Sequence, residues 1–129
     1  MKDKYILDST VWIQIQRGDQ ALIEQVDPLI QANQVCMVDL IIAELLRGTR
    51  TKKDYDRLHN TFLDFPIYGT SWERVAALGY EVGRKGLSPP LTDLYIAQVA
   101  MDHDKTLMSH DKHFRQITKI VPFAFIHLN

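Results

Sequence analysis

The sequence has little of what marks membrane, secreted or fibrous proteins. No segment approaches the roughly 20 consecutive apolar residues that cross a bilayer, and the apolar run near the start is too short for a secretory signal. The single cysteine, Cys36, cannot form an internal disulfide, and its apolar surroundings favour a small buried side chain over a reactive thiol. With only five prolines and six glycines, the chain is also unlike a fibre. We therefore expect a folded, cytoplasmic protein.

An excess of positive charge is also missing. Fifteen Lys and Arg residues against sixteen Asp and Glu residues leave a formal net charge of −1. A protein that holds nucleic acid by electrostatics alone would carry a strong positive balance, so the composition counts mildly against that function. Divalent ions would weaken this objection, because a bound ion reverses the local charge of an acidic cluster.

The chain of 129 residues is 46% hydrophobic, which suits a single domain spanning residues 1–129 around one core. Short apolar runs predict four buried strands, at Tyr5–Leu7, Val35–Val38, Phe65–Tyr68 and Thr106–Met108. Patterns of helical period predict helices between them, over Gln20–Ala32, Leu40–Arg47, Thr51–Phe62, Ser71–Lys85, Thr92–Asp102 and Lys112–Ile117. A terminal apolar stretch, Ile120–Leu128, follows without an assigned structure.

Local signals suggest where several of these helices begin, bend and end. Pro28 is expected to bend or divide the first of them. Thr70 with Glu73 reads as a capping box, Thr92 as the cap of a later helix, and Asp39 as a cap after the second strand. Gly48 and Gly86 are expected to terminate the helices before them. The helix beginning at Ser71 should bury Trp72, Val75, Ala76, Gly79, Val82 and Gly83.

Strands that alternate with helices predict a three-layer α/β/α sandwich with a central, mainly parallel sheet. In such folds sites form at the carboxyl ends of the strands. Asp8 follows the first strand directly and Asp111 follows the last predicted strand by three residues, so both should emerge at that edge. Each also suits a helix N-cap, and the two roles are compatible.

Glu44 is the only polar residue between Leu40 and Leu46, on a helix that should therefore be buried. Because an unpaired buried carboxylate costs several kcal/mol, it needs a cation, a proton or a metal ion. The alternative is that Glu44 faces a narrow solvent stripe or pairs with Arg47 one turn on.

Asp93 shares a helical face with Ile96, Ala97 and Ala100, so its carboxylate should point inward. Stabilisation of the helix N-terminus explains an acid in the first turn, but not its place on the apolar face.

Four carboxylates without histidine or cysteine form an oxygen-only set, which suits Mg²⁺ or Mn²⁺ better than zinc. Such ions activate water and stabilise the charge that develops on a phosphoryl group, which points to phosphate chemistry. Whether one or two ions bind stays open.

Four segments in order, YILDSTVWI, IIAELLRG, TDLYIAQVA and TLMSHDKHF, resemble the PIN-domain nucleases, and among them the VapC toxins of toxin–antitoxin pairs. The resemblance spans nearly the whole chain. It implies that Asp8, Glu44, Asp93 and Asp111 bind Mg²⁺ or Mn²⁺ and cleave an RNA phosphodiester with activated water. It also implies an inhibitory VapB-type antitoxin and a homodimer. Ser9 falls where the family commonly places a hydroxyl near the metal, and Ser109 where threonine is more usual.

Basic residues beside these acids are candidates for contacts with RNA phosphates, although each also suits a solvated helix face. They are Arg47, Arg50, Lys52, Lys53 and Arg57 beyond Glu44, and Lys112, His113 and Arg115 beside Asp111. His110 and His113 stay outside the predicted catalytic set, because a histidine there equally orients a ligand or lies in solvent.

Other acidic α/β proteins fit less well. A phosphorylated receiver domain needs an adjacent acidic pair after its first strand, and a dehalogenase-type phosphatase needs an aspartate where Thr10 stands. The alternative that stays open is a PIN-like interaction protein without significant cleavage activity. The retention of all four acids disfavours it.

Overall fold

The computed structural model describes residues 3–128. Its centre is a five-stranded sheet in the order β3-β2-β1-β4-β5, and all neighbouring strands are parallel. The strands are β1 (Tyr5–Leu7), β2 (Val35–Val38), β3 (Ile67–Tyr68), β4 (Thr106–Ser109) and β5 (Phe125–His127). Every residue of β2 and β4 is buried, as expected where helices cover both faces of a parallel sheet.

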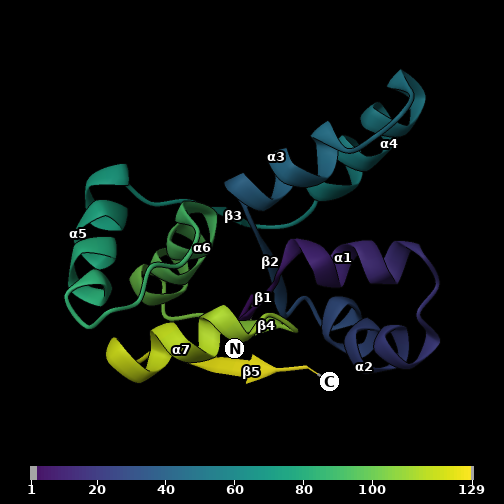
Figure 1. Ribbon diagram of the computed structural model, residues 1–129. Coiled ribbons are helices and arrows are strands. Elements are labelled where there is room, and N and C mark those ends of the chain that lie inside the picture. Colours follow the sequence, from purple (N-terminus) through teal and green to yellow (C-terminus); the bar gives the residue numbers. More distant parts are fainter. Residues whose placement is uncertain (1–2, 129) are drawn as a thin grey trace.

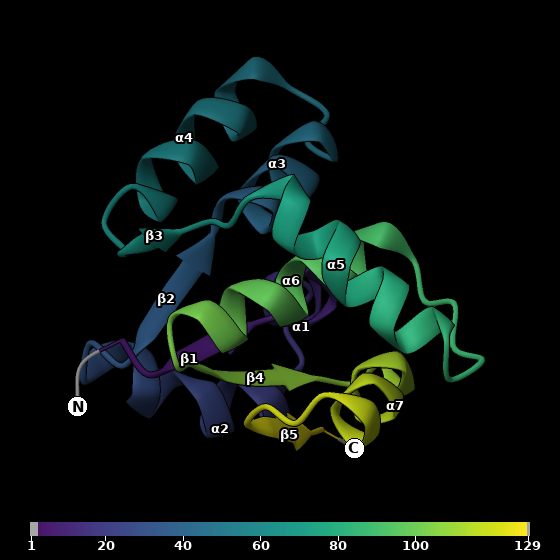
Figure 2. The ribbon, with the colours of Figure 1, turned by 90° about the vertical axis from the view of Figure 1, so that its left-hand side faces the viewer.

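Seven helices connect the strands within the described chain. They are α1 (Ser9–Gln16), α2 (Gln20–Gln31), α3 (Asp39–Arg47), α4 (Lys52–Phe62), α5 (Trp72–Gly83), α6 (Leu91–Asp102) and α7 (Lys112–Ile120). Figure 1 shows α1 and α2 on one side of the sheet and α5, α6 and α7 on the other, while α3 and α4 extend beyond it. Figure 2 shows the twist of the sheet between β2 and β4. The predicted three-layer α/β/α sandwich is confirmed.

The strand order creates a reversal point at β1. From β1 the chain moves to β2 and β3 on one side, then returns to β4 and β5 on the other. β1 and β4 are therefore neighbours, with Leu7 paired to Met108, although 101 residues separate Asp8 from Ser109. In open α/β sheets the crevice beyond the carboxyl ends at such a reversal is the usual ligand site.

The helix that precedes β4, α6, is buried on almost every side. Leu94, Tyr95, Ile96, Ala97, Val99 and Ala100 are all buried. This confirms the inward face predicted for Ile96, Ala97 and Ala100. Within residues 3–128, no helix combines the length and apolar character that a membrane crossing requires.

Several local predictions were wrong. The α1 helix was not foreseen, and Phe65 and Pro66 precede β3 instead of belonging to it. The terminal stretch supplies β5, a fifth strand. Pro28 does not divide α2, which runs unbroken over Gln20–Gln31 with the proline exposed.

The caps also differ from the predictions by one or two residues. Ser71, not Thr70, caps α5 by accepting a hydrogen bond from the Arg74 amide. Pro90, not Thr92, precedes α6, and Asp39 is the first residue of α3 instead of its cap.

The predicted inner face of α5 was only partly right. Val75 and Val82 are buried, but Trp72 is 55% exposed, and Leu78 packs inward without having been predicted. Of the two glycines on the predicted face, Gly79 faces Leu94, whereas Gly83 faces open space.

Candidate functional site

Asp8 lies directly after β1 and is held from three directions. Its carboxylate accepts hydrogen bonds from the Ser9 amide (2.7 Å), the Thr10 hydroxyl (3.2 Å) and the Ser109 hydroxyl (2.8 Å). The residue is only 6% exposed. Burial raises the pKa of Asp8, while the hydrogen bonds from Ser109 and Ser9 oppose that rise by favouring the charged form. The structure therefore fixes one carboxylate firmly at the edge of the sheet.

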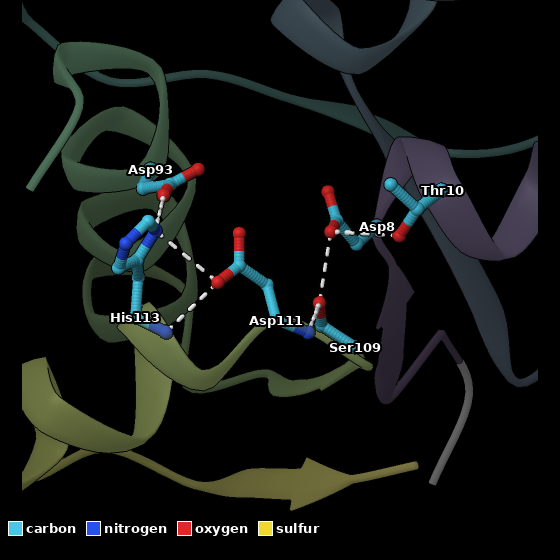
Figure 3. Close-up of polar contacts among 6 residues, drawn as sticks. All are labelled: Asp8, Thr10, Asp93, Ser109, Asp111 and His113. Carbon is cyan, nitrogen blue, oxygen red and sulfur yellow. Dashed lines mark hydrogen bonds and ion pairs between the residues drawn. The ribbon is translucent and has the colours of Figure 1, made fainter. Parts of the chain in front are cut away.

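Ser109, at the end of β4, connects Asp8 to Asp111. Its hydroxyl donates to Asp8 and accepts a hydrogen bond from the Asp111 amide at 2.9 Å (Figure 3). Asp111 in turn caps α7, because its Oδ1 atom accepts from the His113 amide at 2.9 Å. The predicted capping role of Asp111 is confirmed.

Asp93 approaches from the first turn of α6. Burial and then the negative charge of Asp111 raise its pKa to about 6, with a smaller contribution from Asp8. The imidazole of His113 lies beside it, with 3.1 Å between Nδ1 and Asp93 Oδ2. Asp93 thus lies partly buried beside the other acids, as the inward-facing prediction requires.

Glu44 reaches the same region from α3. It is half-buried, less than predicted, because α3 projects past the edge of the sheet. Burial raises its pKa, and the charges of Asp8 and Asp93 raise it further. The Oε1 atom is buried without a hydrogen-bond partner among residues 3–128, so pairing with Arg47 does not account for that oxygen.

The four acids therefore form one electrostatic group. Asp8, Glu44 and Asp93 each have a raised pKa, and each feels the charge of at least one other member. Mutual repulsion among carboxylates is relieved by protons or by a cation. Carboxylate oxygens are the ligands that a hard divalent ion prefers. The buried Oε1 atom of Glu44, which has no hydrogen-bond partner among residues 3–128, is available to bind one.

His113 belongs to this group as well, although the sequence left it outside the predicted catalytic set. Its Nδ1 atom lies 3.1 Å from Asp93 and 3.2 Å from Asp111. The ligand atoms of Asp93, Asp111 and His113 all lie within 4.8 Å of one another. The sequence did contain a signal for this position. If Asp111 caps a helix, His113 lies two residues later, in the first turn of that helix.

The sequence model of the family described as PIN domain matches residues 5–120. The chain belongs to the PIN-domain family. Members of this family are generally nucleases that act on nucleic acid. A comparison with curated protein sequences finds no significant match.

Solved structures similar to this PIN domain include VapBC and FitAB proteins, and one from Klebsiella pneumoniae is described as a toxin–antitoxin complex. VapBC2 from Rickettsia felis, bound to a fragment of its promoter DNA, matches at 20% identity and a TM-score of 0.77, covering 97% of this chain and 98% of the other. FitAcB from Neisseria gonorrhoeae matches at 20% and 0.70, covering 95% and 96%. DNA-bound VapBC from Salmonella typhimurium matches at 18% and 0.76, covering 98% of each chain. At such low identity these similarities establish the fold.

The predicted basic residues flank the acidic group of this PIN domain on two sides. Arg47, Arg50, Lys52 and Lys53 are exposed around the junction of α3 and α4, and Lys112 and Arg115 are exposed on α7. A groove of about 670 Å³ brings Arg50, Arg57 and Arg17 alongside Glu44, between α1, α3 and α4. Arg57 is already paired with Asp54, and Lys52 with Asp56. Arg17 was not among the predicted residues.

The two serines have different surroundings. Ser9 is partly exposed in the first turn of α1, beside both Asp8 and Glu44. Ser109 is fully buried and serves to hold two acids in place. His110 faces the other way, with its Nδ1 atom 3.1 Å from the Leu128 carbonyl oxygen.

Proposed function

We propose that this PIN-domain protein is a metal-dependent endoribonuclease, the VapC-type toxin of a toxin–antitoxin pair. The observation that carries the proposal is that four carboxylates, from the end of β1, α3, α6 and the β4–α7 junction, lie close enough at the carboxyl edge of the sheet for their charges to raise the pKa values of Asp8, Glu44 and Asp93. Repulsion among these carboxylates destabilises the fold unless it is compensated. A bound divalent cation would compensate it, because such ions use carboxylate ligands.

Asp8, Glu44, Asp93 and Asp111 would hold Mg²⁺ or Mn²⁺. When bound, the ion supplies an activated water and stabilises charge on the phosphoryl group that is cleaved. The protein contributes a fixed arrangement of ligands. Ser109 holds Asp8 and Asp111 in register, and Ser9 and Thr10 complete the shell of Asp8. Such supporting contacts orient ligands before the ion arrives.

RNA is the proposed substrate, bound through its phosphates. The candidates are Arg47, Arg50, Lys52 and Lys53 on one side of the acids, and Lys112 and Arg115 on the other. Of these, Arg50 lines the groove that leads to Glu44. A local strip of positive charge suffices to hold a phosphate backbone, so the net charge of −1 is no obstacle.

A VapB-type antitoxin and a second copy of the chain are the proposed partners, acting in the cytoplasm. The similar VapBC structures support the antitoxin, as does the similar structure from Klebsiella pneumoniae that is described as a toxin–antitoxin complex. Exposed aromatic and aliphatic side chains such as Trp72, Tyr80 and Leu91 offer the apolar contact area that protein interfaces use.

The test is cleavage of total cellular RNA by the purified protein freed of any partner. We expect discrete fragments with Mg²⁺ or Mn²⁺ and none with a chelator. Asp93→Asn should lower the rate at least about 100-fold, because it removes a charged ligand of the ion. The side-chain volume hardly changes, so the fold should be retained. Asp104→Asn is the matched control, since Asp104 lies in an exposed turn with a positive φ of 54°, which asparagine tolerates. Absence of cleavage by folded, metal-bound protein would instead support the interaction-protein alternative.

A further inference from the structure

The imidazole of His113 is placed where a ligand of the acid site would lie. Its Nδ1 atom is 3.1 Å from Asp93 Oδ2 and 3.2 Å from Asp111 Oδ1. Figure 3 shows the ring between the two carboxylates, with Asp93 reaching it from α6 and Asp111 from the start of α7. One nitrogen thus faces two acids from different elements.

Local structure fixes this placement. The Asp111 carboxylate accepts the His113 amide, which locks the first turn of α7 against the acid. The next residue, Phe114, is fully buried and contacts the ring of Phe125 on β5. Because Phe114 anchors the helix to the sheet, the rotation of α7 is set and His113 is directed toward Asp93.

The spacing of these atoms matches that of neighbouring ligands around one ion. At a metal–ligand distance of about 2.1 Å, adjacent ligands of a six-coordinate cation lie about 3 Å apart. The two nitrogen–oxygen distances of 3.1 and 3.2 Å agree with this value, and the three ligand atoms lie within 4.8 Å of one another. The side chain is 38% exposed, so the ring is reachable from solvent.

We propose that His113 supplies a nitrogen ligand to the cation held by Asp93 and Asp111, so that the site prefers Mn²⁺ to Mg²⁺. This inference rests on the proposed metal-dependent function. It revises the oxygen-only ligand set that the four acids alone predict. Mg²⁺ strongly favours oxygen ligands and gains little from imidazole, whereas a transition metal such as Mn²⁺ accepts oxygen and nitrogen together.

The experiment compares the wild-type protein with His113→Gln by pulsed electron paramagnetic resonance of bound Mn²⁺, in which a directly coordinated ¹⁴N atom modulates the signal. Titration calorimetry with Mn²⁺ and with Mg²⁺ accompanies it. His59→Gln is the matched control, because His59 lies on α4 and contacts Tyr55 instead of the acids. Circular dichroism verifies that each variant is folded.

We expect the ¹⁴N modulation in the wild type and in His59→Gln, and its loss in His113→Gln. Mn²⁺ affinity should fall about tenfold or more in His113→Gln, on the scale of losses at metal sites, with Mg²⁺ affinity changed less than about threefold. Wild-type protein without ¹⁴N modulation, or without Mn²⁺ binding, would overturn the inference.

An ion-pair role for His113 predicts a different result. A cationic ring competes with the metal for the same carboxylates, so its removal would tighten binding of both ions equally, and that outcome would also overturn the inference. These measurements need no RNA. If only the proposed nuclease function were wrong, the ¹⁴N modulation would be intact and RNA would not be cleaved. Failure of the ligand inference and failure of the nuclease proposal are therefore distinguishable.

Discussion

Asp93 lies in the first turn of α6 with its carboxylate among other acids, and burial together with the charge of Asp111 raises its pKa to about 6 from 3.8. Between these values the native carboxyl group binds a proton that the unfolded chain releases. The contribution of Asp93 to the free energy of unfolding of the metal-free protein therefore rises as the pH falls through about 6, and this gain is complete below about 3.8. At neutral pH the charged group costs stability.

Asp93→Asn should therefore stabilise the metal-free protein at pH 7.5. The shift in pKa corresponds to an upper limit of roughly 3 kcal/mol, and we expect a gain of about 1–2 kcal/mol because the amide interacts less well with His113. Urea unfolding in the presence of a chelator measures it. The gain should shrink as the pH falls from about 6 toward 4. A loss of stability at pH 7.5, or a gain unchanged at pH 4, would contradict the assigned repulsion.

The sequence was informative about which residues carry charge into the site, and less so about how they are held. Asp8 and Asp111 follow strands, so the carboxyl-edge rule located them, and helical periodicity located Asp93. The bridge through Ser109 and the position of His113 were not predicted, because both depend on the rotation of a side chain across two elements. Serine after a strand also forms ordinary turns, which concealed its role.

At the scale of elements, a polar contact ties α3 to α6, the helices that carry Glu44 and Asp93. The Tyr95 hydroxyl donates to the Asp39 carboxylate, at 2.8 Å from Oδ1. It also accepts from the Thr70 amide at 3.3 Å. Gly69 lies against this contact, since a Cβ atom there would be 2.5 Å from Asp39 Oδ2 and 3.1 Å from the Tyr95 oxygen.

Gly69→Ala should therefore displace Asp39 from Tyr95 and lower the free energy of unfolding by about 1–3 kcal/mol. Gly83→Ala is the matched control, because an added Cβ there meets nothing within 4 Å at the end of α5. We expect it to be neutral or stabilising by up to about 1 kcal/mol. In an Asp39→Ala background the Gly69→Ala cost should largely disappear. Equal losses with and without Asp39 would show that the clash lies elsewhere.

Helices with a clear period and strands that are wholly apolar were predicted well, whereas elements of mixed polarity were not. The charged helix α4 matched to within one residue, because its apolar residues repeat at helical spacing. In α1 the last four residues, Ile13 to Gln16, alternate apolar and polar side chains, which obscures a helix. β5 is only half-buried at the edge of the sheet, so it lacks the fully apolar signature of β2. Caps were misplaced because adjacent hydroxyl residues, such as Thr70 and Ser71, suit the position equally.

At the scale of the whole molecule, the positions of the charged residues matter more than the net charge. Fifteen basic and sixteen acidic residues nearly cancel, yet four acids gather at one edge of the sheet with exposed basic side chains next to them. Composition alone therefore counted against nucleic-acid binding, since a sum of charges carries no positions. The groove beside Glu44 shows how a chain with a net charge of −1 can still present arginines to phosphates.

Arg50 tests this arrangement. In an Asp93→Asn background, which is expected to block cleavage, Arg50→Ala should weaken binding to single-stranded RNA several-fold. It should also reduce the slope of log affinity against log salt concentration by about 0.7, the value for one phosphate contact on a single strand. Fluorescence anisotropy over a series of salt concentrations measures both quantities.

Lys4→Ala is the control, because Lys4 is equally exposed but precedes β1, at the opposite edge of the sheet from the acids. Both substitutions remove one positive charge, so an effect of net charge alone would change the two slopes alike. A change confined to Arg50 would mean that RNA follows the groove toward Glu44. Equal changes in the two slopes would mean that the groove has no part in binding. They would favour an RNA path along Lys112 and Arg115 on α7.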